Sequence, residues 1–146
     1  MYTSIVVGTD GSTPARAAVE HAATLAKATG AVLHLVHAYR LPSRAAVVAP
    51  ELATVVAGAD GDAADAARQM VDAAVAELRQ GGLVEVKGHT CPGSAADALC
   101  SVAEAEGADV IVVGNKGMRG ARRVLGSVPN SVAHGATCGV LIVPTV

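Results

Sequence analysis

The sequence predicts an α/β fold built on an open, five-stranded parallel sheet with helices on both faces, and three features carry this prediction. Short β-branched apolar segments alternate with longer segments in which small apolar residues recur at helical spacing. Four of the five strand segments are almost uniformly apolar, as is typical of strands buried on both faces of a parallel sheet. Glycines, prolines and capping residues stand between the segments, where the chain must turn.

Length and composition place the chain among ordinary globular proteins. We expect residues 1–146 to form a single domain with a core of Ala, Val, Leu and Ile, because Phe and Trp are absent. Cys91, Cys100 and Cys138 are odd in number and form no C-x-x-C pair, which favours free thiols in a reducing compartment. The amino terminus lacks a signal peptide's basic region, and no apolar run could span a membrane. A cytoplasmic protein without a membrane partner is therefore expected.

Turn residues delimit the first two strands and the helix between them. The β-branched run at residues 4–9 ends in D-G-S-T-P, where Pro14 suits the first turn of a helix and Ser12 or Thr13 can cap it. A glycine ends that helix, which we place at residues 15–29. The apolar run that follows predicts a second strand over residues 31–39.

The middle of the chain has a poor pattern that is followed by a long helix. Prolines and glycines interrupt residues 40–61, which we interpret as a long, partly ordered connection near the ligand or a partner, with room for a short helix. Residues 62–80 carry apolar side chains on one helical face, and two glycines end this helix. A third strand is predicted over residues 83–90, followed by a turn at residues 91–94.

The last part of the chain repeats the strand and helix alternation. Ser94 and Asp97 form a capping box that opens a helix running to Glu106. The remaining elements are a strand at 110–113, a glycine-rich loop, a helix at 127–134 and a strand at 139–143.

Right-handed crossovers that wind both ways from the first strand give the strand order 3-2-1-4-5. The first and fourth strands are then neighbours at the point where the winding reverses. The loop that carries Thr9 and Asp10 therefore faces the glycine-rich loop across a crevice, and the order predicts one site from two distant segments.

The segment 114–127, G-N-K-G-M-R-G-A-R-R-V-L-G-S, predicts phosphate binding. Its glycines let backbone amides approach an anion closely, and Ser127 stands at the positive end of the next helix. Its cations, including Lys116 and Arg119, bring the net charge from residue 110 onward to +4, against −6 for residues 1–109. This local field fits a small anion, and without stacking aromatic residues a nucleic-acid partner is not expected.

Few other polar residues suggest chemistry. Asp10 is expected to accept hydrogen bonds from the turn amides that follow it and, equally, to contact the ligand directly or hold Mg²⁺ against its phosphates. His34 and His37 lie three apart on a strand, so they point to opposite faces and should not share a metal. His89 and Cys91 have no assigned role. Walker, dinucleotide and catalytic-triad patterns are absent, so fast hydrolysis is not expected.

Over its whole length the chain resembles the universal stress protein family. The resemblance is carried by V-G-T-D-G-S, L-V-H-A, G-N-K-G, L-G-S-V-P and the closing V-L-I-V-P. It implies a Rossmann-like fold of the adenine nucleotide alpha hydrolase-like type. It also implies a cytoplasmic homodimer, joined through the last strand, that serves stress adaptation. The loop spacer 118–125 is one residue shorter than in the family's nucleotide-binding members.

The resemblance further implies an adenine nucleotide as ligand, with ATP as first candidate and AMP or cyclic AMP as alternatives, accompanied by Mg²⁺. Thr9 and Asp10 would meet the adenine and ribose, and the backbone of Ala38 would read the adenine edge. Val113 would lie beside the nucleoside, and the glycines and Ser127 would hold ribose and phosphates. The candidate site residues are Gly8, Thr9, Asp10, Ala38, Val113, Gly114, Lys116, Gly117, Arg119, Gly126, Ser127 and Val128.

The favoured function is a dimeric nucleotide-binding regulatory protein that is not an enzyme or hydrolyses ATP at most slowly. Two alternatives stay open: a slow nucleotide hydrolase or transferase, and a partner-binding module whose shorter loop no longer takes nucleotide. Against the first, T-D-G-S lacks the S-G-G-x-D-S pattern of ATP-pyrophosphatase enzymes. The apolar edge strand at 140–143 independently invites pairing with another chain.

Overall fold

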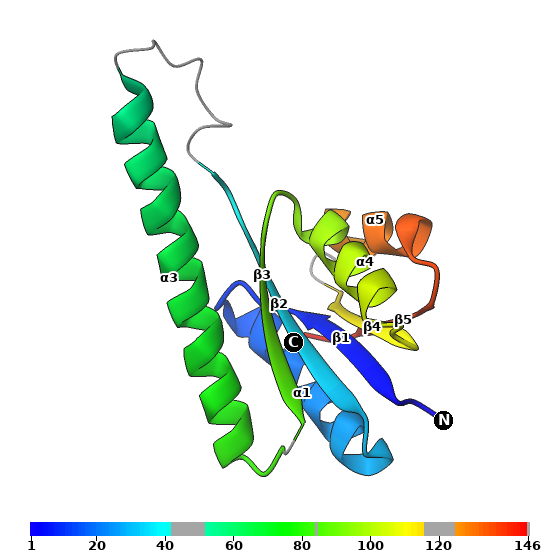
Figure 1. The fold of residues 1–146 in the computed structure, drawn as a ribbon. Coiled ribbons are helices and arrows are strands. Elements are labelled where there is room, and N and C mark those ends of the chain that lie inside the picture. Colours follow the sequence, from blue (N-terminus) through cyan, green and yellow to red (C-terminus); the bar gives the residue numbers. More distant parts are fainter. Residues whose placement is uncertain (42–51, 84, 116–124, 146) are drawn as a thin grey trace.

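The computed structural model describes residues 1–41, 52–83, 85–115 and 125–145. These residues form a parallel five-stranded sheet in the order β3-β2-β1-β4-β5, so the predicted fold class and strand order are confirmed (Figure 1). The strands are β1 (Ser4–Gly8), β2 (Val32–Tyr39), β3 (Val86–Pro92), β4 (Val110–Gly114) and β5 (Gly139–Val143). The helices are α1 (Thr13–Thr29), α3 (Ala53–Gln80), α4 (Ala95–Ala105) and α5 (Ser127–Gly135).

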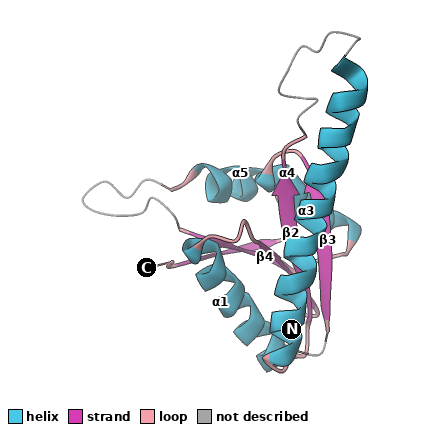
Figure 2. Cartoon of the chain, turned by 90° about the vertical axis from the view of Figure 1, so that its left-hand side faces the viewer, coloured by secondary structure: helices cyan, strands magenta, loops and turns pink. Residues whose placement is uncertain are grey.

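The central strand β1 is buried on both faces. Ile5, Val6 and Val7 are all 0% exposed, because successive side chains of a strand point to opposite sides and both sides are covered. Ile5 and Val7 belong to a core shared with α1 and α3. Val6 belongs to a second core shared with α4 and α5. Figure 2, together with Figure 1, shows α1 and α3 on one face of the sheet and α4 and α5 on the other.

Helix α1 begins and ends as its sequence predicts. Ser12 is the N-cap, and its hydroxyl accepts a hydrogen bond from the amide of Ala15 at 3.3 Å. Pro14 occupies the first turn, and Gly30 ends the helix in the left-handed conformation with φ of 73°. The buried face of the helix consists of alanines, which lets its backbone lie close to the sheet.

Helix α3 corrects the prediction of a long connection at residues 40–61. It begins at Ala53 rather than at residue 62. Its first turns extend beyond the sheet, and they bury little apolar surface: Leu52 and Val55 are 52% and 68% exposed (Figure 1). Without a core to face, this part of the helix needs no periodic apolar pattern, so the pattern could not reveal it. The rest of the connection, residues 42–51, lies outside the described residues.

Strand β3 lies further along the chain than the predicted span of residues 83–90. Leu83, which the prediction included in the strand, lies in the loop before it and packs into the core from there. Cys91 and Pro92, which we had placed in a turn, pair with the end of β2. Since β3 is an edge strand, Pro92 needs no amide hydrogen there. The turn instead begins at Gly93, which has φ of 114°.

Gly88 marks the closest approach between β3 and α3. A Cβ atom at this position would overlap Cγ1 of Val71 and lie 3.2 Å from Cγ2 of Val75. We therefore expect Gly88→Ala to lower the free energy of unfolding by about 1–3 kcal/mol, measured by urea denaturation. The control is Gly58→Ala in α3, where a Cβ meets nothing within 4 Å. It should raise stability by up to about 1 kcal/mol. Wild-type stability in Gly88→Ala would show that the two elements are not in tight contact.

Asp109 ties the segment before β4 to the start of β1. Its Oδ2 atom accepts hydrogen bonds from the amide of Thr3 at 2.6 Å, the hydroxyl of Thr3 at 3.0 Å and the amide of Ser4 at 3.0 Å. The two backbone hydrogen bonds stabilise the carboxylate and lower the pKa of Asp109 below its ordinary value, and the hydrogen bond from the Thr3 hydroxyl lowers it further. The folded-state pKa is thus the lower one, so this stabilisation is present above the unfolded-state pKa and is lost as pH falls through the folded-state pKa.

The Asp109→Asn variant should consequently be less stable than wild type at neutral pH. It should also lose less stability on acidification below about pH 5, because the titrating group is gone. Urea denaturation at a series of pH values measures both effects. Asp72→Asn, on the exposed side of α3, controls for the loss of one negative charge. Parallel pH profiles for wild type and Asp109→Asn would contradict this account.

Candidate functional site

A cavity of about 470 Å³ lies at the carboxyl ends of β1 and β4, where the winding of the sheet reverses. This volume is in the range of small-molecule sites, which is about 300–1,000 Å³. The segment after β1 forms one wall and the end of β4 with the start of α5 forms the other. The two segments that the strand order was predicted to bring together therefore do meet.

Most of the candidate site residues line this cavity. Those in its walls and floor are Gly8, Thr9, Asp10, Ala38, Val113, Gly114, Gly126, Ser127 and Val128. Lys116, Gly117 and Arg119 lie outside the described residues. The structure thus gathers the described candidates in one place, while their contacts with a ligand stay predictions.

The turn after β1 is held by its own polar groups. The hydroxyl of Thr9 accepts from the amide of Gly11 at 3.2 Å, and Oδ1 of Asp10 accepts from the amide of Ser12 at 2.9 Å. Gly11 has φ of 78°, which explains a glycine at this point. Asp10 had been expected to accept from both amides, but that of Gly11 is bonded to Thr9. Asp10 is exposed and lines the cavity, so its carboxylate combines a turn role with a position beside a ligand.

A second contact positions this turn from β2. Nδ1 of His37 lies 2.9 Å from the carbonyl oxygen of Thr9, to which it donates. The amide of Thr9 in turn donates to the carbonyl oxygen of Val36 at 2.8 Å. His37 thus points away from His34, which lies on the opposite face of β2, as the spacing predicted.

The opposite wall is completed by the segment after β5, which sequence reasoning missed. Oδ1 of Asn115 accepts from the amide of Thr145 at 3.0 Å and from its hydroxyl at 3.1 Å. A Cβ atom on Gly114 would overlap Cγ2 of Thr145, so only glycine allows this approach. Thr145 therefore lines the cavity beside Gly114. The asparagine within G-N-K-G was the available signal, but its partner is far along the chain.

Helix α5 presents its amino terminus to the cavity. Gly126 is its N-cap, Ser127 is its first residue and exposed, and no side chain of the described residues caps it. Its first backbone amides and the positive end of the helix dipole can therefore stabilise a negatively charged group. This is the arrangement that the serine after the last glycine of the loop predicted.

The floor of the cavity is apolar. It includes Val36 of β2, Ala15 and Ala18 of α1, and Ala95 and Leu99 of α4. Sequence reasoning did not select these residues, because small apolar side chains at helical spacing indicate only a face turned toward a core. An apolar floor beneath a polar rim suits a ligand with one weakly polar part and one charged part.

None of the three cysteines lines the cavity. Cys91, Cys100 and Cys138 are free, as predicted, and half-buried. Burial raises the pKa of each thiol, and nearby negative groups raise those of Cys100 and Cys138 further. Neutral thiols are poor nucleophiles.

No helix within the described ranges is long and apolar enough to cross a membrane.

An open, doubly wound parallel sheet with a polar-rimmed cavity at its switch point defines a Rossmann-like α/β protein. More narrowly, the chain belongs to the universal stress protein family, whose sequence model matches residues 1–144. The universal stress protein Rv1636 of Mycobacterium tuberculosis is 37% identical over an alignment that covers 99% of this chain and 97% of that protein.

Solved structures show the same relationship. A universal stress protein crystallised in complex with cyclic AMP is 33% identical, superposes with a TM-score of 0.73, and is matched over 99% of both chains. A universal stress protein from Archaeoglobus fulgidus in complex with dAMP is 25% identical with a TM-score of 0.65, matched over 97% of both chains.

Proposed function

We propose that this protein binds an adenine nucleotide in the cavity between β1 and β4 and acts as a cytoplasmic, homodimeric regulatory protein of stress adaptation. The observation that carries the proposal is the meeting of a glycine-lined wall, a helix amino terminus and an apolar floor in one cavity. The two related proteins crystallised with cyclic AMP and dAMP support the adenine class. The single-domain organisation and the absence of a nucleic-acid partner remain predictions.

The chemistry of the walls suggests how the nucleotide lies. The adenine ring would rest on the apolar floor near Ala38, whose short side chain leaves space for it. The ribose would lie near Thr9 and Asp10, and a carboxylate is a strong acceptor for ribose hydroxyls. The phosphate would meet Gly126 and Ser127 at the amino terminus of α5.

ATP is the first candidate ligand, with AMP and cyclic AMP as alternatives. With ATP, the phosphate tail would continue toward the segment that contains Lys116, Gly117 and Arg119, and Asp10 would hold Mg²⁺ against the phosphates. Cations at that segment match the charge of such a tail. The role proposed is binding rather than turnover, because the sequence lacks the Walker pattern and the S-G-G-x-D-S pattern of enzymes that turn over nucleotides.

Two substitutions test the proposed pose from opposite ends of the nucleotide. Ala38→Leu should fill the adenine position, and Gly126→Leu should obstruct the phosphate position. Each should weaken binding of ATP, AMP and cyclic AMP by about 100-fold, which corresponds to about 2.7 kcal/mol. Isothermal titration calorimetry measures the affinities, and circular dichroism shows whether each variant is folded.

The matched control is Gly58→Leu in the exposed part of α3, which should bind like wild type. Native mass spectrometry of gently purified wild-type protein should show a co-purifying adenine nucleotide. Wild-type affinity in both folded cavity variants would overturn the proposed site. Lack of affinity in the wild-type protein for all three nucleotides would overturn the function itself.

The proposed dimer uses the edge strand β5. This strand is last in the sheet order, and its Leu141 and Ile142 are 41% and 37% exposed. An apolar edge strand with free backbone groups is a surface on which a second chain pairs readily. We propose that two copies of this chain pair through β5.

Lysines on that edge should prevent the pairing. The double variant Leu141→Lys, Ile142→Lys is expected to be monomeric at concentrations where the wild type is a dimer, because buried like charges oppose association. Size-exclusion chromatography with light scattering gives the mass. Leu52→Lys, at an exposed site on the other side of the fold, should remain dimeric. A double variant that stays dimeric would place the interface elsewhere.

A further inference from the structure

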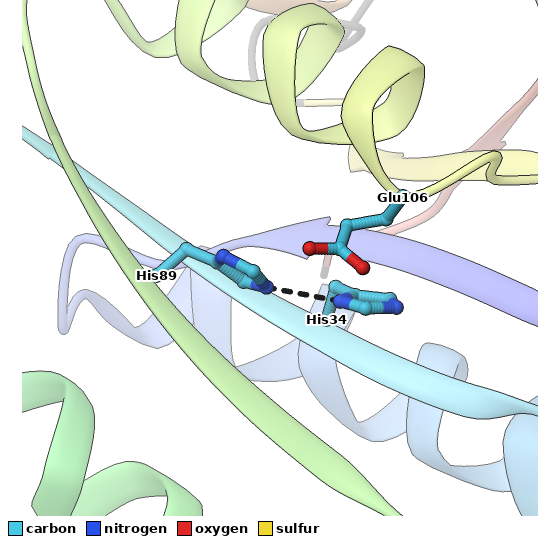
Figure 3. A group of neighbouring side chains, drawn as sticks. All are labelled: His34, His89 and Glu106. Carbon is cyan, nitrogen blue, oxygen red and sulfur yellow. Dashed lines mark hydrogen bonds between the residues drawn. The ribbon is translucent and has the colours of Figure 1, made fainter.

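A second group of polar side chains lies apart from the cavity, on the α4 face of the sheet. His34 comes from β2, His89 from β3, and Glu106 from the residue that ends α4 (Figure 3). One nitrogen of each imidazole and one carboxylate oxygen of Glu106 lie within 4.8 Å of one another. His34 is buried, His89 half-buried and Glu106 exposed. None of the three lines the cavity between β1 and β4.

The register of the sheet explains how the two imidazoles meet. Parallel pairing places Lys87 beside His34 and His89 beside Val36. Register neighbours in a parallel sheet point to the same face, so His89 lies on the face that His34 and Val36 share. Nδ1 of His34 and Nε2 of His89 are 2.9 Å apart, and the ring centroids are 5.1 Å apart. Figure 3 shows the carboxylate of Glu106 turned toward this pair.

The spacing of the two imidazole nitrogens suits one metal ion. Imidazole nitrogens bind Zn²⁺ at about 2.0–2.1 Å, so two nitrogens 2.9 Å apart fit ligands at about 90° around it. A separation wider by about 0.4 Å would give the tetrahedral angle. The Glu106 side chain is long and exposed, so it can rotate to bring an oxygen to about 2.0–2.2 Å. Its exposure also provides an entry path and room for a water ligand.

We propose that His34, His89 and Glu106 bind a divalent transition-metal ion, with Zn²⁺ as the first candidate. Two imidazoles and one carboxylate with an open fourth position form a ligand set that zinc commonly takes in proteins. The proposed metal site is independent of the proposed nucleotide site, since the two share no residue.

Burial and nearby charge favour the neutral form of both imidazoles. Burial lowers the pKa of both His34 and His89 below its ordinary value, and the charge of Lys87 lowers each further. The negative charge of Glu106 raises the pKa of both histidines. Neutral imidazoles keep the lone pairs that metal binding needs. Glu106 and the negative end of the α4 dipole supply compensating charge, while Lys87 opposes the bound ion.

The site would join three elements: β2, β3 and the end of α4. His34 and His89 belong to neighbouring strands, and Glu106 ends the helix that packs over them. A metal held by all three elements binds the folded chain more tightly than the unfolded one. Its binding should therefore raise the thermal midpoint of unfolding in a concentration-dependent way.

The test uses the full chain, freed of metal by a chelator and measured without nucleotide. Zn²⁺ is titrated by calorimetry and Co²⁺ by visible absorption, and one ion per chain is expected. His89→Gln and Glu106→Gln should each weaken Zn²⁺ binding by at least about 10- to 100-fold. Their melting curves without metal show that they fold, and their nucleotide affinity should match that of wild type.

Matched controls separate the cluster from other histidines and carboxylates. His21→Gln on α1 and Glu104→Gln on α4 change exposed residues of the same types and should bind Zn²⁺ like wild type. Lys87→Met removes the opposing charge and should tighten binding, an effect that a hydrogen-bonded histidine pair without a metal would not produce.

Three results would overturn the proposal. One is the absence of stoichiometric Zn²⁺ and Co²⁺ binding to the folded wild-type chain. Another is wild-type affinity in both His89→Gln and Glu106→Gln. The third is a cobalt complex with a strong thiolate charge-transfer band, which would assign the ion to cysteines instead. Nucleotide binding is measured separately, so failure of the metal site leaves the proposed function intact.

Discussion

The parallel pairing of β1 with β4 is the constraint on which the rest of the structure depends. These strands are far apart in the sequence, yet Ile5 pairs with Val110 and Val7 with Val112. Their side chains are 0–2% exposed, since helices cover both faces. Because the chain winds away from this pair in opposite directions, no helix of the described residues covers the gap at their carboxyl ends. The cavity is a consequence of that topology, and the polar residues that line it are those that follow the two strands.

Small side chains shape both the packing and the cavity. A core without Phe or Trp can be dense only if helices lie close to the sheet, and the buried alanines of α1 allow this. Gly88 serves the same purpose under Val71 of α3. At the carboxyl ends of the strands, small side chains leave a cavity open instead of tightening the packing. There Ala38 leaves space that a larger residue would fill, while Gly114 allows Thr145 to approach and complete the wall of the cavity.

The sequence predicted the strand order and most of the cavity because both rest on local patterns with simple rules of connection. Apolar runs located the strands, and the turn residues beyond Gly8 and Gly114 located the walls. The part of α3 before residue 62 was missed, since a helix segment that buries little leaves no periodic apolar stripe. Thr145 was missed because its contact with Asn115 joins the end of one strand to the end of another.

By itself the sequence determined the α/β class, the parallel order of the strands and the place where the cavity forms. Apolar patterns and glycine positions are properties of short segments, so they can be recognised without coordinates. The right-handed crossover is a general rule that then fixes how the segments connect. Only the tertiary structure decided which histidines meet. Along the chain His34 is nearest to His37, but side chains three apart on a strand point away from each other. The sheet register instead brings His34 to His89, 55 positions away, because pairing between strands fixes distances that sequence separation does not contain.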